Sequence, residues 1–170
     1  MDKGQVHLYW GDGKGKTTAA FGLALRMLGS GGTVALVQFL KDGQSSELEP
    51  LRQLGARVYS GQPGTGFFSR MSPEERKTVR ARHDDLLRQA LAQPCDLLVL
   101  DEACAACRLG MVDEALVRQA VLDRPAGREV VLTGRDPADW MQQAANYSTE
   151  MRCHKHPYQQ GITARKGVEY

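Results

Sequence analysis

The 170-residue sequence lacks several features that would place it in a special class of protein. It has only four cysteines (Cys95, Cys104, Cys107 and Cys153), too few and too scattered for a disulfide scaffold in a chain of this size. No apolar run approaches the roughly 18–20 residues of a membrane span, and no apolar signal segment follows the N-terminus. These absences favour a protein of the reducing cytoplasm that has no membrane partner.

A strong charge of one sign is also missing, since 22 basic and 20 acidic residues leave a net charge of +2. So small a net charge gives no strong field toward nucleic acid or membrane surfaces. The most basic stretch, 76–88, has no aromatic residues of the kind on which nucleic-acid bases stack. We therefore expect no nucleic-acid partner, and we expect this stretch to be a helix surface on which His83 is solvated.

What is present is an ordinary globular composition, with 42% hydrophobic and 25% charged residues in a length typical of one domain. Short apolar runs alternate with longer helical patterns, which predicts one α/β domain over residues 1–170 with a mostly parallel sheet. Strands are expected at 6–10, 33–40, 57–59, 96–102 and 129–132. Helices are expected at 17–28, 47–54, 72–91, 112–122 and 137–145, with Ser72 capping the longest.

A glycine-rich loop between the first strand and the first helix is the sharpest signal in the sequence. The loop residues expected to bind nucleotide phosphates are Gly11, Asp12, Gly13, Lys14, Gly15, Lys16, Thr17 and Thr18. Glycines let the backbone point successive N–H groups at an anion, and the helix N-terminus adds to this cradle. Lys16 would add a point charge on the phosphates, and the Thr17 hydroxyl would ligate Mg²⁺. The general pattern G-x-x-x-x-G-K-[ST] has its first glycine where this sequence has Trp10, so the loop is a modified one.

Two acidic residues, Asp101 and Glu102, end a buried strand about eighty residues further on. Mg²⁺ binds few carboxylates together with water and substrate phosphates. We expect Asp101 to hold Mg²⁺ directly or through water, and Glu102 to ligate the metal, contact a ribose or act as a base. The alternative is a charged strand end that caps the next helix. Arg135 follows another strand and could clamp phosphate oxygens, although a surface arginine after a turn would look the same.

These residues together resemble the P-loop type of ATP:corrinoid adenosyltransferase, which acts on cob(I)alamin or cob(I)yrinic acid a,c-diamide. The resemblance runs nearly end to end, through GDGKGKTTAAFGLALR, VQFLK, GTGF, DLLVLDE, VVLTGR and the tail TEM…KHPYQQGITARKGVEY. The family's own loop also lacks the usual first glycine, which agrees with Trp10. The resemblance implies a P-loop NTPase-like (RecA-like) fold of three α/β/α layers.

The resemblance also implies a reaction in which the Co(I) of a reduced corrinoid attacks the 5′-carbon of ATP and triphosphate leaves. Lys16 and Glu102 are then the expected catalytic residues. The glycine-rich loop and Arg135 would bind ATP, with its phosphates reversed along the loop. Mg²⁺ would be held by Thr17, Asp101 and Glu102. The implied partners are ATP, the reduced corrinoid and a flavodoxin-like reductant, and the implied assembly is a homodimer.

Aromatic residues in the loop that here reads GTGFFSR are expected to bind the corrinoid. In the family they crowd the lower face of the corrin ring and displace the axial ligand, which makes the cobalt easier to reduce. Phe67 matches the first of these aromatics. The second falls on Ser69, with Phe68 beside it, so whether Phe68 replaces it is open.

Two other functions remain as alternatives at this point. A P-loop ATPase or small-molecule kinase would give orthophosphate or ADP instead of triphosphate. A carrier that binds without catalysis would use the same fold. A zinc site built on Cys104 and Cys107 is a weaker interpretation than two small buried side chains on a helix.

Overall fold

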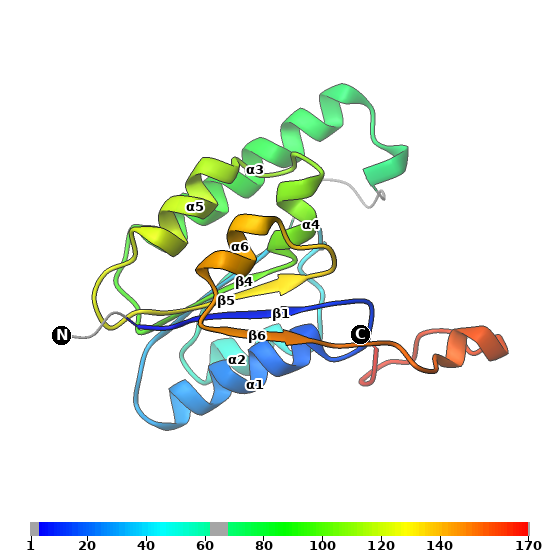
Figure 1. Ribbon diagram of the computed structural model, residues 1–170, viewed down its shortest axis with the longest axis horizontal. Coiled ribbons are helices and arrows are strands. Elements are labelled where there is room, and N and C mark those ends of the chain that lie inside the picture. The colour runs from blue at the N-terminus through cyan, green and yellow to red at the C-terminus, as the bar shows by residue number, and fades with distance from the viewer. Residues whose placement is uncertain (1–3, 62–67, 170) are drawn as a thin grey trace.

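A computed structural model describes residues 4–61 and 68–169. Its centre is a six-stranded sheet in the order β3-β2-β4-β5-β1-β6, in which every neighbouring pair is parallel (Figure 1). The strands are β1 (Val6–Trp10), β2 (Val34–Gln38), β3 (Arg57–Tyr59), β4 (Leu97–Asp101), β5 (Glu129–Gly134) and β6 (Tyr147–Glu150). The predicted parallel α/β architecture is confirmed.

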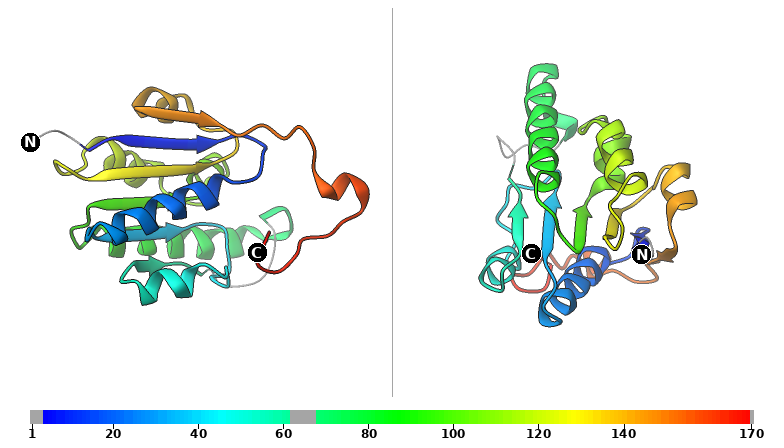
Figure 2. Two further views of the ribbon diagram at one scale, coloured as in Figure 1. Left: turned by 90° about the horizontal axis from the view of Figure 1, so that it is seen from below. Right: turned by 90° about the vertical axis from the view of Figure 1, so that its left-hand side faces the viewer.

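Helices cover both faces of the sheet and complete the three layers (Figures 1 and 2). One face carries α1 (Lys16–Gly29) and α2 (Leu48–Gln53). The other carries α3 (Pro73–Leu91), α4 (Ala103–Arg108), α5 (Glu114–Leu122) and α6 (Asp139–Ala144). Two short 3₁₀ turns, η1 (Phe68–Arg70) and η2 (Pro157–Gln160), lie outside the layers. Among the described residues, no helix combines the length and apolar character that crossing a membrane requires.

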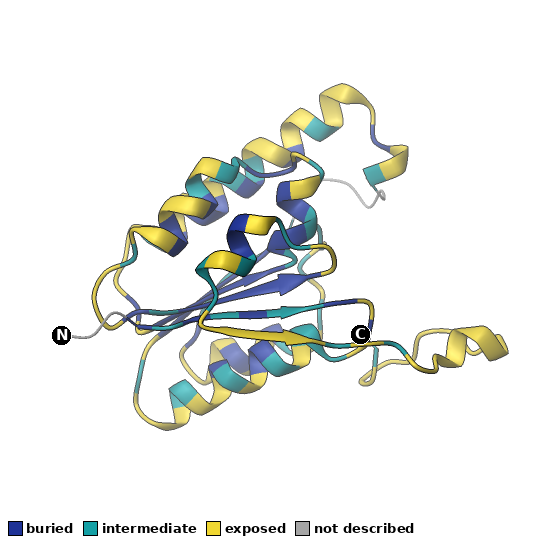
Figure 3. Cartoon of the chain, viewed as in Figure 1, coloured by how far each residue is buried: buried dark blue, intermediate teal, exposed yellow. Residues whose placement is uncertain are grey.

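The central strands are buried because both of their faces are covered (Figure 3). All five residues of β2 and all five of β4 are buried. Successive side chains of a strand point to opposite faces, so Val34 and Leu36 pack with α1 while Ala35 and Val37 pack with α3 and α4. Continuous apolar runs of this kind are typical of parallel strands buried on both faces.

The longest helix, α3, begins where its capping signal predicts. The Ser72 hydroxyl accepts a hydrogen bond from the Glu75 amide at 3.2 Å, and the Glu75 carboxylate accepts one from the Ser72 amide at 2.6 Å. A cap of this kind stabilises a helix by about 1 kcal/mol. The prediction that His83 is solvated was wrong, because its side chain is fully buried. His83 follows Val79 by four residues and precedes Leu87 by four, so it lies on the buried stripe of the helix.

The edge strand β6 was not predicted, since its four residues are polar or amphipathic and all are exposed. It is held beside β1 by specific contacts. Tyr147 stacks on His7 with ring centroids 4.6 Å apart, and Trp10 Nε1 donates to the Ser148 hydroxyl at 3.0 Å. Beyond β6, residues 151–169 swing away from the sheet and return toward the first loop (Figure 2).

Candidate active site

The predicted site residues gather at the carboxyl-terminal edge of the sheet, because parallel strands all end there. Gln38 lies beside Asp101 in the strand register, and Trp10 lies beside both Gly134 and Glu150. A cleft of about 1130 Å³ opens at this edge. The residues that line it include Lys14 to Thr18, Leu40, Lys41, Phe68, Glu102 and Lys166 to Glu169.

The glycine-rich loop is shaped by the chain that follows β6. Gly11 and Gly15 have φ angles of 112° and 115°, which only glycine adopts freely. The Gly13 amide donates to the Met151 carbonyl at 2.7 Å, and the Asp12 carboxylate accepts from the Cys153 amide at 3.0 Å. This second bond lowers the pKa of Asp12. The loop conformation therefore depends on Met151 to Cys153 as well as on its own sequence.

Replacing Gly13 by alanine is expected to destabilise the protein by about 1–3 kcal/mol, because the added methyl overpacks the contact with the tail. A Cβ at this position would lie 2.7 Å from the Met151 carbonyl oxygen. Gly22 is the matched control, since it lies exposed in α1 and a Cβ there meets nothing within 4 Å. Gly22→Ala should instead stabilise the helix by roughly 0.5–1 kcal/mol. Urea unfolding of both variants measures the contrast, and equal effects would refute it.

Lys16 extends over the loop, where its ammonium donates to the Gly13 carbonyl at 2.7 Å. Burial lowers the pKa of Lys16, while the negative charge of Glu102 opposes this change and Arg135 adds to it. Arg135 is exposed just after β5, and its charge also acts on Asp12 and Glu102. The structure thus brings four charged residues of the predicted site close enough to influence one another, namely Asp12, Lys16, Glu102 and Arg135.

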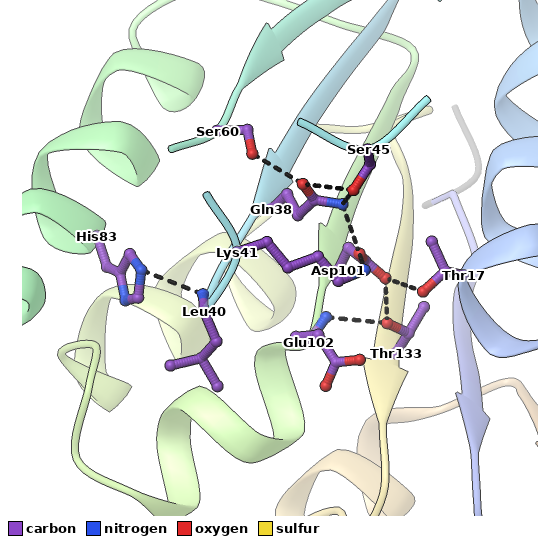
Figure 4. Close-up of polar contacts among 10 residues, drawn as sticks. All are labelled: Thr17, Gln38, Leu40, Lys41, Ser45, Ser60, His83, Asp101, Glu102 and Thr133. Carbon is purple, nitrogen blue, oxygen red and sulfur yellow. Dashed lines mark hydrogen bonds and ion pairs between the residues drawn. The ribbon is translucent and has the colours of Figure 1, made fainter. Parts of the chain in front are cut away.

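Asp101 is fully buried at the centre of the site and accepts four hydrogen bonds (Figure 4). Its Oδ1 accepts from the Thr17 hydroxyl at 2.8 Å and from the Thr133 hydroxyl at 2.7 Å. Its Oδ2 accepts from Lys41 Nζ at 2.9 Å and from Gln38 Nε2 at 3.2 Å. Since the Thr17 hydroxyl donates its proton to Asp101, its lone pairs stay available to a cation. In this arrangement Asp101 orients Thr17.

Glu102 has a backbone conformation that is rare for a residue with a side chain. Its φ is 61°, and among the described residues only Leu40, with a φ of 59°, shares this feature outside glycine. Both residues line the cleft. Such conformations cost about 1–3 kcal/mol and persist where the surroundings enforce them. Here the Glu102 amide donates to the Thr133 hydroxyl at 3.0 Å, which helps to fix the turn between β4 and α4.

The Glu102 carboxylate accepts no hydrogen bond from the part of the chain that the structure describes, residues 4–61 and 68–169. Burial, together with the nearby charge of Asp101, raises the pKa of Glu102 above its ordinary value of 4.5. The side chain is therefore held in a site that disfavours its charge unless a cation is close. Lys41, Lys16 and Arg135 lower the pKa again, but by less than burial raises it.

Replacing Glu102 by glutamine should therefore raise the thermal stability of the protein. The raised pKa means that ionising Glu102 costs the folded state free energy that the unfolded chain does not lose. Below about pH 4.5 both states are protonated and the variant should gain little. The gain should grow as the pH rises through the raised pKa. Melting temperatures at pH 4 and pH 8 test this, and a variant less stable at pH 8 would contradict it.

Of the two predicted corrinoid-binding residues, Phe67 lies outside the described residues. Phe68 begins η1, lines the cleft and packs with Met71, Val79 and Met111. The Arg76 guanidinium lies 4.1 Å from the centroid of its ring. Phe68 thus has one side in a small apolar cluster and one at the cleft.

Sequence reasoning missed Gln38, Lys41 and Thr133, although each follows from a visible signal. Gln38 is the one polar residue in the otherwise apolar run VALVQFL, and it is completely buried. Lys41 follows the end of β2 by three residues and Thr133 is the last but one residue of β5, so both lie at the same edge as Asp101. The tail contributes as well, since Lys14 Nζ donates to the Val168 carbonyl at 2.8 Å. Cys104 and Cys107 are buried on α4, as expected for core side chains.

Comparison with known proteins gives a consistent match over the whole chain. The sequence profile of the family described as ATP:corrinoid adenosyltransferase BtuR/CobO/CobP matches residues 2–170. A corrinoid adenosyltransferase of Pseudomonas aeruginosa is 36% identical over 172 residues, which cover 99% of this chain and 85% of that protein. The corrinoid adenosyltransferase of Escherichia coli K12 is 31% identical over 175 residues, with coverages of 99% and 87%. Corrinoid adenosyltransferase CobA of Salmonella typhimurium is 32% identical over 178 residues, with the same coverages.

Proposed function

Because this chain belongs to the ATP:corrinoid adenosyltransferase family BtuR/CobO/CobP and transfers an adenosyl group from ATP to a corrinoid, we propose that the transfer takes place in the cleft at the carboxyl edge of the sheet. The observation that carries this proposal is the meeting of the glycine-rich loop with Asp101, through the 2.8 Å hydrogen bond from Thr17. It joins the two halves of a nucleotide site that lie 84 residues apart in the chain.

In the proposed reaction, the electron pair of Co(I) in the reduced corrinoid attacks the 5′-carbon of ATP. A cobalt–carbon bond forms, the bond from that carbon to the 5′-oxygen breaks, and triphosphate leaves with the electron pair. No protein atom is bonded to the transferred group at any stage. The protein contributes by aligning the carbon with cobalt and by stabilising the charge of the leaving group.

The loop residues supply this charge stabilisation. The backbone amides of the loop and the N-terminus of α1 form the anion cradle for the phosphates. Lys16 adds a cationic group, which donates to the Gly13 carbonyl of the loop and would donate to the phosphates of bound ATP. Arg135 directly follows β5, whose last residue Gly134 pairs with Trp10 just before the loop, and it adds a second cation. Asp101 holds the Thr17 hydroxyl in one orientation.

The residues present also fit a magnesium ion. Mg²⁺ takes oxygen ligands and keeps several waters, so two protein ligands with substrate phosphates suffice. The Thr17 hydroxyl has free lone pairs, and the Glu102 carboxylate faces the cleft with a raised pKa that a cation would reverse. When bound, Mg²⁺ would neutralise part of the charge on the triphosphate. Asp101 would support it through Thr17 or through water.

The remaining features of the function rest on the family resemblance. We propose that Phe67 and Phe68 contact the corrinoid, that a flavodoxin-like protein supplies electrons to the cobalt, and that the protein works as a cytoplasmic homodimer. The location of Phe68 at the cleft supports the first of these. A low-potential donor is required by any reaction that begins from Co(I).

An anaerobic assay with ATP, Mg²⁺ and a chemically reduced Co(I) corrinoid tests the proposal. We expect loss of the Co(I) absorbance, a light-sensitive cobalt–carbon product and one triphosphate per corrinoid. ADP or orthophosphate with unchanged corrinoid would instead indicate an ATPase or a kinase. Competition by added triphosphate, lost when Lys16 is replaced, would assign the reaction to this cleft.

A further inference from the structure

A buried histidine on α3 holds the segment that carries Lys41 into the active site. This segment, the β2–α2 connection (residues 39–47), forms one wall of the cleft. Three side chains from outside the segment hold it (Figure 4). His83 contacts its Leu40 amide, Asp101 contacts its Lys41 ammonium, and the buried Gln38 side chain contacts its Ser45 hydroxyl.

The contact with His83 defines the tautomer of the imidazole. His83 Nδ1 lies 2.8 Å from the Met111 carbonyl oxygen, which can only accept, so Nδ1 carries the proton. His83 Nε2 lies 3.2 Å from the Leu40 amide, which can only donate, so Nε2 is the acceptor. Both ring nitrogens are thereby used, in a side chain that is fully buried and lies edge-on to Phe39.

The residue that His83 holds is in an unfavourable conformation. Leu40 has a φ of 59°, and a leucine leaves this region unless its neighbours prevent it. A relaxed Leu40 would turn the following residue in a new direction. That residue is Lys41, whose ammonium lies 2.9 Å from the buried carboxylate of Asp101, while the same carboxylate orients the Thr17 hydroxyl.

We propose that His83 is a positioning residue for adenosyl transfer, which acts by fixing Leu40 so that Lys41 stays on Asp101 and Asp101 stays aligned with Thr17. The inference rests on the proposed function, because its effect is exerted on the ATP half of the cleft. His83 does not touch the substrates in this account. It determines the position of the Lys41 ammonium in the site.

Two amide substitutions separate this role from simple packing in the core. In His83→Gln the longer side chain can present its carbonyl oxygen where Nε2 stood, and so can accept from the Leu40 amide. In His83→Asn the shorter side chain can donate to Met111 from the position of Nδ1 but does not reach Leu40. The two variants therefore each retain one of the two hydrogen bonds.

We expect His83→Asn to raise the KM for ATP about tenfold, and His83→Gln to stay within about threefold of the wild type. Affinity for Mg·ATP, measured by titration calorimetry, should change in parallel. Thermal unfolding and circular dichroism establish that each variant is folded at the assay temperature. Equal KM values in the two variants would overturn the proposal, whatever their stabilities.

A double variant tests whether the effect passes through Lys41. Once Lys41→Met has removed the ammonium, adding His83→Asn should weaken ATP binding no further. If the two losses multiply, His83 acts by another route and the proposal is wrong. Adenosyl transfer by the wild-type protein is measured in the same series. Its absence would count against the proposed function, whereas the comparison of variants in calorimetry judges His83 alone.

Discussion

Replacing Lys16 by methionine is expected to lower kcat for adenosyl transfer at least a hundredfold while the fold stays intact. Removing one preorganised group that stabilises developing charge typically costs about 10²–10³ in rate. Here the charge develops on a triphosphate, and Lys16 is the loop cation that faces it. Methionine keeps the length of the side chain and removes only the ammonium. Because burial lowers the pKa of Lys16, the folded protein loses little by giving up this charge.

The rate of Co(I) disappearance under anaerobic conditions measures this effect. Lys77→Met on the exposed surface of α3 is the control and should leave the rate unchanged. It makes the same chemical change far from the loop. A Lys16→Met protein that keeps more than a tenth of the wild-type rate would show that the leaving group is stabilised elsewhere.

Replacing Thr17 by valine is expected to lower adenosyl transfer about a hundredfold and to raise the Mg²⁺ concentration needed for half-maximal rate. Valine has nearly the shape of threonine but no hydroxyl, so both the proposed ligand and the hydrogen bond to Asp101 are lost. Asp101 keeps its hydrogen bonds from Thr133, Lys41 and Gln38, so its buried carboxylate is still satisfied. The variant should therefore fold.

Thr17→Ser is the matched control, because it restores the hydroxyl and removes only a methyl group. Its rate should lie within about fivefold of the wild type, with an unchanged Mg²⁺ requirement. Rates are measured over a Mg²⁺ titration at saturating ATP. If serine and valine variants behave alike, the hydroxyl of Thr17 has no part in the reaction.

The fold was largely predictable because most of its strands can be recognised from their own residues. The run LLVL at 97–100 is apolar throughout, which is typical of a strand buried on both faces. Strand β6 carries no such signal, since its residues are exposed and its position is decided by β1 alongside it. Helix α4 is short, and its N-cap is the left-handed Glu102, whose side chain makes no capping hydrogen bond, so the sequence carries no signal for its start.

The residues of the local motifs in the candidate site could be predicted, but the hydrogen bonds that join them could not. The glycines, Lys16 and Thr17 form a local motif, and the two acids end a strand. The side chains that donate hydrogen bonds to the Asp101 carboxylate are determined instead by the register of three strands. Strand β5 matters in particular, because it lies between β1 and β4 and supplies Thr133. His83 was misjudged because its charged neighbours in sequence outweighed its four-residue spacing from Val79 and Leu87.

The contacts between the glycine-rich loop and the tail also set an order of events during synthesis. Lys14 and Val168, which meet beside the loop, are 154 residues apart in the chain. A ribosome makes the loop well before the residues that contact it, Met151 to Cys153 and Val168. Domains made in this direction can pair only the residues that have already emerged. A growing chain therefore exposes the loop without these contacts until residues 151–168 have also emerged.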